Sequence, residues 1–201
     1  MSPLPKPPAC DQSAATDRAK PEPPGVQIRN PKSEIVKTAG IALGSNIEPR
    51  LENLRRAGQH LRQLAVPNTP FLMSRVYETA PVDCPPDSPP FLNAALELTT
   101  TLEPHALLSE LLRIESLLGR PPRHALNAPR PIDLDILYFN NLSLQTKDLV
   151  LPHPCLTVRR FVLQPLADIH PDLVIETKTV DQWLSELPED ESLKLNNSSF
   201  L

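Results

Sequence analysis

The segment from Ile132 to Phe139 alternates aliphatic side chains with carboxylates, and this pattern constrains the fold more than any other part of the chain. Side chains two residues apart in a strand share a face, so Asp133 and Asp135 are predicted to lie on one face, about 7 Å apart along the strand. The opposite, buried face is predicted to carry Ile132, Leu134, Ile136 and Tyr138. The segment therefore predicts a half-buried strand of a sheet.

The two carboxylates raise an electrostatic problem. Neighbouring ionised carboxylates repel each other and lose hydration when half-buried, so a fold that keeps both charged normally supplies cations to them. Hard divalent ions such as Mg²⁺ are commonly bound by one or two carboxylates together with substrate phosphates. Because the motif is so short, the alternative is a solvated strand face that binds no metal, and the neighbouring motifs are needed to distinguish the two interpretations.

Length and composition limit the class of protein. The chain has 201 residues, 40% hydrophobic and 22% charged, which is enough for one domain with a real core. Its formal charge of −4 argues against a nucleic acid or a membrane surface as the main partner. Three scattered cysteines, Cys10, Cys84 and Cys155, have no metal-ligand spacing and indicate reduced thiols. With no long apolar run and no secretory signal pattern, we expect a soluble, cytoplasmic protein.

Both ends of the chain differ from its middle. Eight of the 26 prolines precede Lys32, and residues 1–33 have no periodic apolar pattern, so a disordered, proline-rich tail is predicted there. Acidic residues in this segment argue against a transit peptide. Residues 189–201 are polar and predict a flexible C-terminal tail. The catalytic domain is predicted at residues 34–188.

Strands and helices are predicted in the order β-α-β-β-α-β. The strands are expected at 35–43, 71–78, 91–100 and 132–139, and helices are expected after Pro49 and Pro104. The proline-rich loop 79–90 contains too many prolines to pair as a strand in a sheet, and loops of this length usually have a function. A hairpin at 142–151, a helix broken or bent at Pro165, and a short helix capped by Thr179 complete the prediction. This order predicts an α+β, ferredoxin-like antiparallel sheet with helices packed on its faces.

Two positions in these elements point to a site. Phe91 and Asn93 share a strand face, which places an amide beside an exposed ring in a ligand-facing pair. Glu115 lies within the apolar stripe of the second helix, which is expected to end at Gly119. That carboxylate either supports an arginine or backbone amides, or else extends to water.

The remaining polar residues describe phosphoryl transfer to a flat heterocycle. The two aspartates are accompanied by a histidine between prolines, His153, and by arginines in the flanking loops at positions 120, 123, 130 and 159. In such reactions the protein mainly positions groups and neutralises charge. No nucleophile arrangement competes, and a P-loop kinase is excluded because the chain has no glycine-rich phosphate loop.

A series of motifs then carries a family resemblance. In chain order they are Ile41–Asn46, Ser74–Thr79, Phe91–Ala95, Ile114–Arg120, Pro129–Asp135, Leu151–Pro154 and Arg159–Leu166. Together they resemble the 6-hydroxymethyl-7,8-dihydropterin pyrophosphokinase family of folate biosynthesis over most of residues 35–187. The resemblance implies transfer of pyrophosphate from ATP to the hydroxymethyl oxygen of the dihydropterin, giving AMP and the dihydropterin diphosphate.

The resemblance also implies roles for individual residues. Asp133 and Asp135 would bind two Mg²⁺ ions and act in catalysis together with Arg120 and Arg130. The residues expected to contact ATP are Arg120, Arg123, Arg130, His153 and Arg159. The residues expected to bind the pterin are Thr79, Pro81, Val82, Phe91, Asn93 and Phe161, with both rings stacking on it. If the family resemblance is left aside, the sequence favours a structural role for His153 and a place in the core for Phe161.

The chain departs from the family pattern in one loop. Pro122 stands where many members have a second arginine, with Arg123 next, and Asn127 stands where many have tryptophan. Two other classes remain open: a metal-dependent nucleotide-sugar transferase or phosphodiesterase that uses the Asp-x-Asp motif, and a non-catalytic paralogue. Expected partners are ATP and hydroxymethyl-dihydropterin, with other folate-pathway enzymes as further candidates and no nucleic acid or membrane.

Overall fold

The computed structural model describes residues 35–121 and 128–197. The predicted N-terminal tail and the loop residues Pro122, Arg123 and Asn127 lie outside these ranges. The described part contains a six-stranded antiparallel sheet with the order β10-β3-β4-β1-β5, in which β2 also pairs with β4. Its strands are β1 (Lys37–Ser45), β2 (Phe71–Met73), β3 (Val76–Thr79), β4 (Phe91–Thr100), β5 (Asp133–Phe139) and β10 (Lys194–Asn196).

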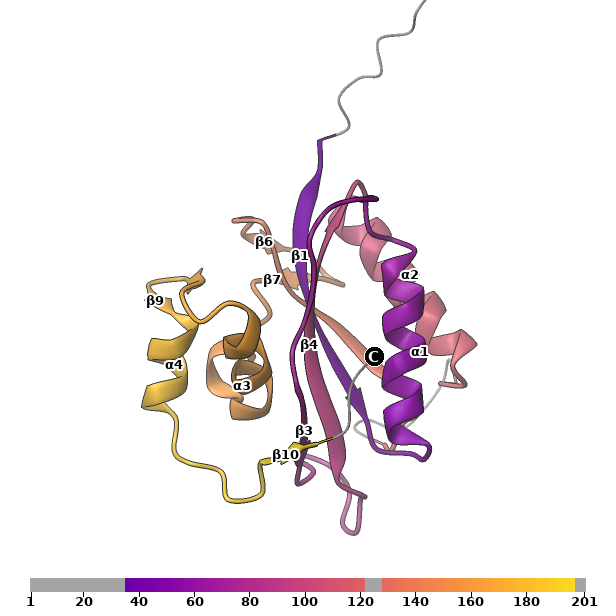
Figure 1. Ribbon diagram of the computed structural model, residues 1–201, viewed down its shortest axis with the longest axis vertical. Helices are drawn as coiled ribbons and strands as arrows, with labels where there is room; N and C mark the ends of the chain where they lie inside the picture. The colour runs from indigo at the N-terminus through magenta and orange to yellow at the C-terminus, as the bar shows by residue number, and fades with distance from the viewer. Residues whose placement is uncertain (1–34, 122–127, 198–201) are drawn as a thin grey trace, which may run out of the picture. The chain divides into compact units, whose positions relative to one another are not determined.

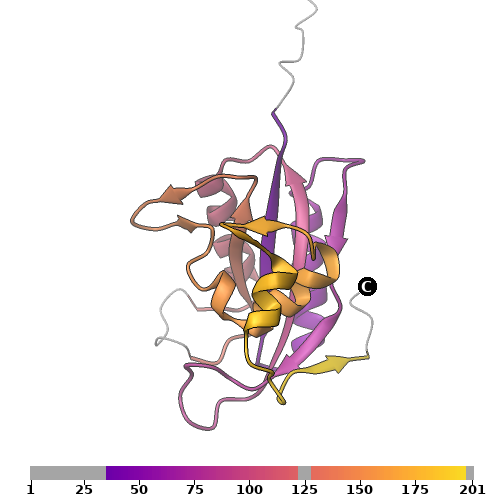
Figure 2. The same ribbon diagram turned by 90° about the vertical axis from the view of Figure 1, so that its left-hand side faces the viewer.

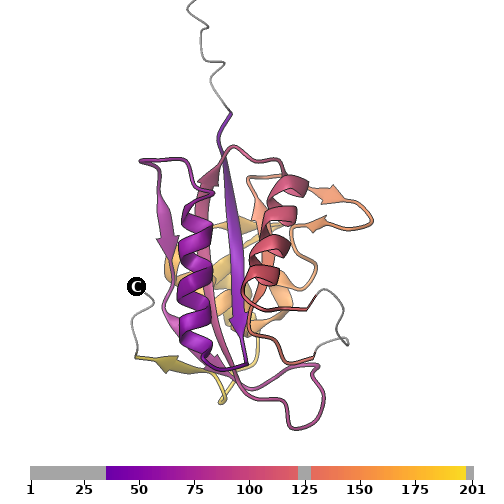
Figure 3. The same cartoon turned by 90° about the vertical axis from the view of Figure 1, so that its right-hand side faces the viewer.

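Helices cover both faces of this sheet (Figure 1). One face carries α1 (Arg50–Arg62) and α2 (Pro104–Leu117), which lie side by side in Figure 3. The other face carries α3 (Arg160–Ile169), with α4 (Val180–Glu186) packed on it, as Figure 2 shows. The described residues are thus a mixed α and antiparallel-β structure, and none of their helices has the length and apolar character needed to cross a bilayer.

Shorter elements connect these layers. They are the hairpin of β6 (Leu144–Gln145) and β7 (Val150–Leu151), the 3₁₀ turn η1 (Leu156–Val158), and the hairpin of β8 (Val174–Ile175) and β9 (Lys178–Thr179). The first hairpin was predicted from the sequence. The predicted caps are also confirmed, because Gly119 has a φ of +95° after α2 and Thr179 forms a capping box with Gln182.

Each face of the sheet has its own apolar core. Leu54 and Leu61 of α1, which packs on β1 and β4, and Leu111 of α2, which packs on β5, are fully buried in one core, as their spacing predicts. Burying one such leucine contributes about 1.5–3 kcal/mol, which is why these stripes fix both helices on the sheet. Leu112 was expected in the same stripe but is 55% exposed, because it lies on the outer side of α2.

Two expectations about local breaks are wrong. The predicted strand 71–78 is two strands, because Ser74 interrupts it: Ala95 N donates to Ser74 Oγ at 2.8 Å, so a side chain replaces a ladder carbonyl. Pro165 was expected to break or bend its helix, and the break does not occur, because α3 continues through this residue. Pro165 is buried, and this burial contributes apolar stabilisation against the lost N–H bond.

The aspartate strand changes face at one point. Asp133 and Asp135 share a face as predicted, but Gly40 pairs with Tyr138 while Ile41 pairs with Ile136, so Leu137 has no partner on β1. This bulge shifts the alternation by one residue. Tyr138 therefore packs with α3 on the aspartate side, and its predicted place on the opposite face is wrong.

The residues after Glu189 also differ from the prediction. A flexible tail was expected there, yet Lys194–Asn196 forms β10 and pairs with β3 at the edge of the sheet. Polar residues hide this strand from pattern analysis, because an edge strand needs backbone pairing but little apolar surface.

The packing of Tyr138 yields a stability prediction. A Cβ on Gly40 would lie 2.1 Å from Tyr138 Cε1, and the ring cannot move freely because its hydroxyl donates to Glu97 Oε2 at 2.5 Å. We expect Gly40→Ala to lower the free energy of unfolding by about 1–3 kcal/mol, measured by urea denaturation. In a Tyr138→Ala background the same change should cost much less. Equal costs in both backgrounds would contradict the assigned contact.

Candidate functional site

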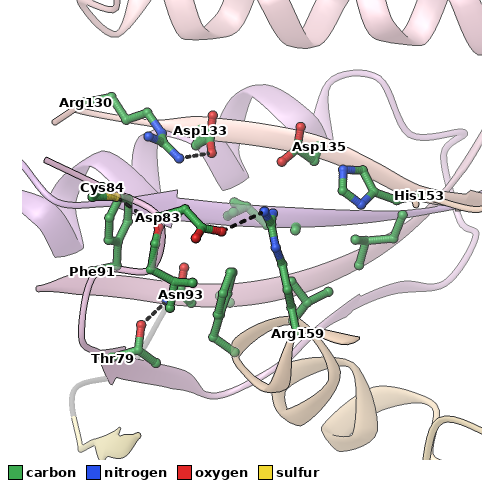
Figure 4. Close-up of a pocket in the computed structure, with 18 of the residues that line it drawn as sticks. Thr79, Asp83, Cys84, Phe91, Asn93, Arg130, Asp133, Asp135, His153 and Arg159 are labelled. Carbon is green, nitrogen blue, oxygen red and sulfur yellow. Dashed lines mark hydrogen bonds and ion pairs between the residues drawn. The ribbon is translucent and has the colours of Figure 1, made fainter. Parts of the chain in front are cut away.

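A cavity opens on the aspartate face of the sheet, between β5, the start of α3 and the loop that follows β3 (Figure 4). Its floor is the central strand β1, where small residues, Ala42 and Gly44, leave room above the sheet. Gly44 pairs with Asn93 of β4 on one side and with Asp133 of β5 on the other. A Cβ on Gly44 would lie 3.2 Å from Asn93 Oδ1, so this glycine keeps the space between the two polar residues open.

Asp133 is held by two arginines. Arg120 Nη1 donates to its Oδ1 at 2.6 Å, and Arg130 Nη2 donates to its Oδ2 at 2.7 Å. All three side chains are largely buried, with exposed fractions of 16–21%. The Nε atoms of both arginines have no hydrogen-bond partner among the described residues. The guanidinium groups therefore keep donor capacity beyond their contacts with Asp133.

Glu115 supports this arrangement from α2. It is 5% exposed, and its Oε1 accepts hydrogen bonds from Arg120 Nη1 and, at 2.8 Å, from the backbone N–H of Leu134. Burial raises the pKa of its carboxyl, while the charge of Arg120 opposes that rise. Of the two alternatives that the sequence left open for Glu115, the structure shows the first, support of an arginine and a backbone amide. Arg120 lies between two carboxylates and is not among the residues that line the cavity.

Asp135 is the second cavity-lining carboxylate on this strand. Its pKa is raised mainly by burial and then by the charge of Asp133, against the opposing effects of His153 and the two arginines. The described residues thus leave Asp135 with less compensating positive charge than Asp133 receives.

His153 faces the same space from the segment after β7 (Figure 4). Its Nδ1 accepts from the backbone N–H of Cys155 at 3.2 Å, so the neutral ring carries its proton on Nε2. Burial lowers the pKa of this histidine, with Asp135 opposing. The ring is therefore a neutral N–H donor beside the second carboxylate.

The other end of the cavity is polar and aromatic. Asn93 Nδ2 donates to Thr79 Oγ1 at 2.7 Å, which fixes the amide and leaves its oxygen on the side of Gly44. Phe161 is half-buried at the cavity, with the Arg159 guanidinium 5.6 Å from its ring centre. Phe91 also lines the cavity but is only 7% exposed, so the expectation of an exposed ring is wrong. Its ring packs 5.1 Å from the Arg130 guanidinium.

The fold therefore brings most of the predicted site residues together. Those that line the cavity are Thr79, Val82, Phe91, Asn93, Arg130, Asp133, Asp135, His153, Arg159 and Phe161. Pro81 is not among them, and Arg120 contacts the cavity only through Asp133. Arg123 lies outside the described residues.

Sequence reasoning missed three residues around this cavity. Asp83 and Cys84 line it, and the Asp83 carboxylate lies 4.0 Å from Arg159 Nη2. Asn46 fixes the backbone of Arg130 by accepting its N–H at 2.7 Å, and donates to the carbonyl of Pro89 at 3.3 Å. The long proline-rich loop was a signal for the first two, and the Ile41–Asn46 motif contained the third.

Chemically, the cavity has two unlike halves. One half offers carboxylates, arginines and a neutral histidine, a set suited to cations and phosphate oxygens. The other half offers a fixed amide and aromatic rings, a set suited to a flat, hydrogen-bonding ring. Asp133 of the first half and Asn93 of the second pair with Gly44 from opposite sides of β1.

Relatives of known name match the chain over this region. A protein of Bacillus subtilis named 2-amino-4-hydroxy-6-hydroxymethyldihydropteridine pyrophosphokinase is 47% identical over 131 residues, which is 65% of this chain and 77% of that protein. The Haemophilus influenzae protein of the same name is 37% identical over 161 residues, 79% of this chain and 98% of that protein. A mitochondrial folate synthesis bifunctional protein of Arabidopsis thaliana is 40% identical over 160 residues. The match covers 80% of this chain but only 27% of that longer relative.

Solved structures and a family model complete the comparison. The crystal structure of Plasmodium falciparum HPPK-DHPS aligns with 76% of this chain and 44% of its own, with a TM-score of 0.59 and 16% identity, which shows a shared fold. The model of the 7,8-dihydro-6-hydroxymethylpterin-pyrophosphokinase (HPPK) family matches residues 40–171, including both aspartates, His153 and Phe161. The chain therefore belongs to the 7,8-dihydro-6-hydroxymethylpterin-pyrophosphokinase family.

Proposed function

We propose that this protein transfers the pyrophosphoryl group of ATP to the hydroxymethyl oxygen of 6-hydroxymethyl-7,8-dihydropterin, in folate synthesis. The products are AMP and the dihydropterin diphosphate. The observation that carries the proposal is the two-sided cavity, in which Gly44 lies between Asn93 and Asp133 in a chain of this family. A ring acceptor and a phosphate donor can therefore meet above one strand.

The architecture is consistent with this assignment. We infer a ferredoxin-like core made of β1, α1, β3, β4, α2 and β5, because the strand order β3-β4-β1-β5 and the placement of α1 and α2 on one face agree with it. The catalytic domain, proposed from the sequence at 34–188, is then extended by β10 at its edge.

The proposed pterin subsite lies between Asn93 and Phe161. The Asn93 amide oxygen accepts from a donor on the edge of the ring, because its nitrogen is already bonded to Thr79. Phe161 stacks on one face of the ring and Phe91 on the other, and the backbone of 79–82 adds hydrogen bonds. This subsite uses the apolar and amide half of the cavity.

The proposed ATP subsite uses the charged half. Arg130, Arg159 and the Nε2–H of His153 donate to phosphate oxygens, and Arg120 stabilises the transition state. Both Arg120 and Arg130 are bonded to Asp133 in this structure, so each must share that carboxylate with the triphosphate or leave it. The contact of Arg123 with ATP stays a prediction from the sequence.

The carboxylate pair suits Mg²⁺. Each oxygen of Asp133 has lone pairs beyond its arginine bond, and Asp135, with its raised pKa, lies where added positive charge would favour ionisation. Among residues 35–121 and 128–197, no group of three acidic, histidine or cysteine side chains forms a metal site by itself. Two Mg²⁺ ions, shared between these aspartates and the triphosphate, would neutralise phosphate charge and orient the groups.

The proposed step is an in-line displacement at the β-phosphorus. The hydroxymethyl oxygen forms the new bond to phosphorus and releases its proton, while the bond from the β-phosphorus to the bridging α,β-oxygen breaks and AMP leaves. The described residues supply position and charge: the amide and rings hold the acceptor, and the arginines hold the phosphates. Cytoplasmic location and other folate-pathway enzymes as partners stay predictions, and two plant relatives are named as mitochondrial bifunctional proteins.

The nucleotide product tests the reaction. With Mg²⁺, ATP and 6-hydroxymethyl-7,8-dihydropterin, we expect AMP in a one-to-one ratio to the dihydropterin diphosphate, resolved by ion-exchange chromatography. AMP formation should require the pterin. Stoichiometric ADP would instead indicate single phosphoryl transfer and contradict the proposal.

The aspartates provide a second test. Asp133→Ala and Asp135→Ala should each lower kcat/KM by at least about a hundredfold, on the order of 3 kcal/mol of transition-state stabilisation, because the metal would be lost or displaced. Steady-state kinetics and melting temperatures separate this effect from unfolding. Asp148→Ala, an exposed aspartate between β6 and β7, is the matched control and should keep full activity. Near-normal turnover in either cavity variant would remove that residue from the metal site.

The proposed stacking is tested with Phe161. Phe161→Ala should weaken binding of the pterin by more than about threefold beyond any effect on ATP, because aromatic stacking adds about 0.5–1.5 kcal/mol to area burial. Phe161→Leu keeps apolar volume and should retain only part of the affinity. Calorimetry with Mg²⁺ and α,β-methylene-ATP, followed by the pterin, gives both constants. Equal loss for both ligands would make Phe161 a core residue.

A further inference from the structure

The segment after α4, Leu187–Asn196, runs back from the helix to the edge of the sheet beside β3 (Figures 1 and 2). It lies beyond residues 40–171, which the family model matches. We propose that this C-terminal segment is part of the pterin site and that Ser192 is a positioning residue, which holds the substrate loop (residues 79–90) through the backbone of Ala80. The inference rests on the proposed function.

Arg160 ties the start of the segment to the cavity wall. Its Nη1 donates to the carbonyl oxygens of Leu184, Leu187 and Pro188 at 3.3, 3.1 and 3.2 Å. The neighbours of Arg160 in the chain, Arg159 and Phe161, both line the cavity. The start of the segment is therefore fixed to the same turn of chain that presents these two side chains.

Strand pairing fixes the other end of the segment. Lys194 pairs with Glu78 and Leu195 with Tyr77, so β10 borders the strand that leads into the substrate loop. The next residue after Glu78 is Thr79, whose hydroxyl fixes the Asn93 amide. The edge strand thus ends one residue short of the proposed pterin contacts.

Ser192 lies between these two anchors. Its Oγ donates to Asp190 Oδ1 at 2.6 Å, and Asp190 Oδ1 also accepts the Ser192 backbone N–H at 2.9 Å. Because the hydroxyl proton is committed to Asp190, a lone pair on Oγ is free to accept. The backbone N–H of Ala80 donates to it at 3.1 Å.

The hydrogen bond from Ala80 to Ser192 lies directly after the last residue pair of β3 and β4. Thr79 pairs with Phe91 as the last pair of β3 and β4, and Ala80 is the first residue beyond it. Ala80 and Val82 both line the cavity. Holding the Ala80 amide therefore restricts the backbone of 79–82 before the pterin binds, so less ordering is left for binding itself.

The contacts predict an effect that is specific to one ligand. ATP is proposed to bind at Arg130, Arg159 and His153, and none of these residues shares a hydrogen bond with Ser192 among the bonds described. Loss of the Ser192 hydroxyl should therefore weaken binding of the pterin and leave the affinity for the nucleotide unchanged. A merely structural serine would affect both ligands, or stability alone.

The experiment uses the full chain and compares Ser192→Ala, Ser192→Thr and Ser185→Ala with the wild-type protein. Ser185 is the matched control, because its hydroxyl also bonds within the C-terminal part, to Gln182 O on the exposed side of α4. Calorimetry measures the affinity for α,β-methylene-ATP in the presence of Mg²⁺ first, and then the affinity of that complex for 6-hydroxymethyl-7,8-dihydropterin. Amide hydrogen exchange at Ala80 and melting temperature are measured in parallel.

We expect Ser192→Ala to lower the affinity for the pterin by about threefold to tenfold, which is the effect of losing one hydrogen bond. The affinity for the nucleotide should stay unchanged, and the Ala80 amide hydrogen should exchange faster. Ser192→Thr, which keeps a hydroxyl, should restore binding, and Ser185→Ala should match the wild type. Unchanged pterin affinity in Ser192→Ala, or equal loss of both ligands, would overturn the inference while leaving the proposed function intact. A wild-type protein that binds nucleotide but no pterin would overturn the proposed function and this inference together.

Discussion

The buried ion network around Arg120 connects the helical layer to the cavity. Arg120 bonds Glu115 of α2 and Asp133 of β5, and Arg130 closes the network on the other oxygen of Asp133. Removing one partner of such a network leaves an uncompensated charge, which typically costs about 3–5 kcal/mol. The position of the Asp133 carboxylate therefore depends on a helix that lies on the opposite face of the sheet. Because Glu115 also accepts the Leu134 N–H, the network holds the backbone of β5 beside Asp133.

Small residues in the central strand decide where the cavity can form. Gly40, Ala42 and Gly44 lie on the face that carries Asp133 and Asp135, and each leaves space that a larger side chain would fill. At Gly40 the space is taken by the Tyr138 ring, so the sheet is closed and apolar there. At Gly44 a Cβ would contact the Asn93 amide at 3.2 Å and the edge of the Phe91 ring at 3.6 Å, so the glycine leaves the cavity floor open between Asn93 and Asp133. The same face of β1 therefore borders a packed core at Gly40 and the cavity at Gly44.

Loop 79–90 shows how a proline-rich segment is held without strand pairing. Asn46 at the end of β1 fixes Arg130 and also donates to Pro89, and Arg50 donates to the Pro90 carbonyl at 2.9 Å. These bonds hold the end of the loop next to β4, while the Ala80 amide is held at its start. The middle of the loop carries Asp83, whose carboxylate lies near Arg159, one of the residues proposed to contact phosphate. The loop is therefore anchored at both ends and presents charge to the cavity between them.

Local pattern determined much of this protein from the sequence alone. The strand Phe91–Thr100, the shared face of the two aspartates and the helix end at Gly119 all follow from periodicity and residue chemistry within short windows. Asn93 and Asp133 lie at one cavity because β4 and β5, the strands that carry them, both pair with β1. Only tertiary structure decided the bulge at Leu137, the pairing of β10 and the approach of Asp83 to Arg159. Each of these depends on contacts between segments distant in the chain, and a strand bulge or a polar edge strand leaves no periodic signal of its own.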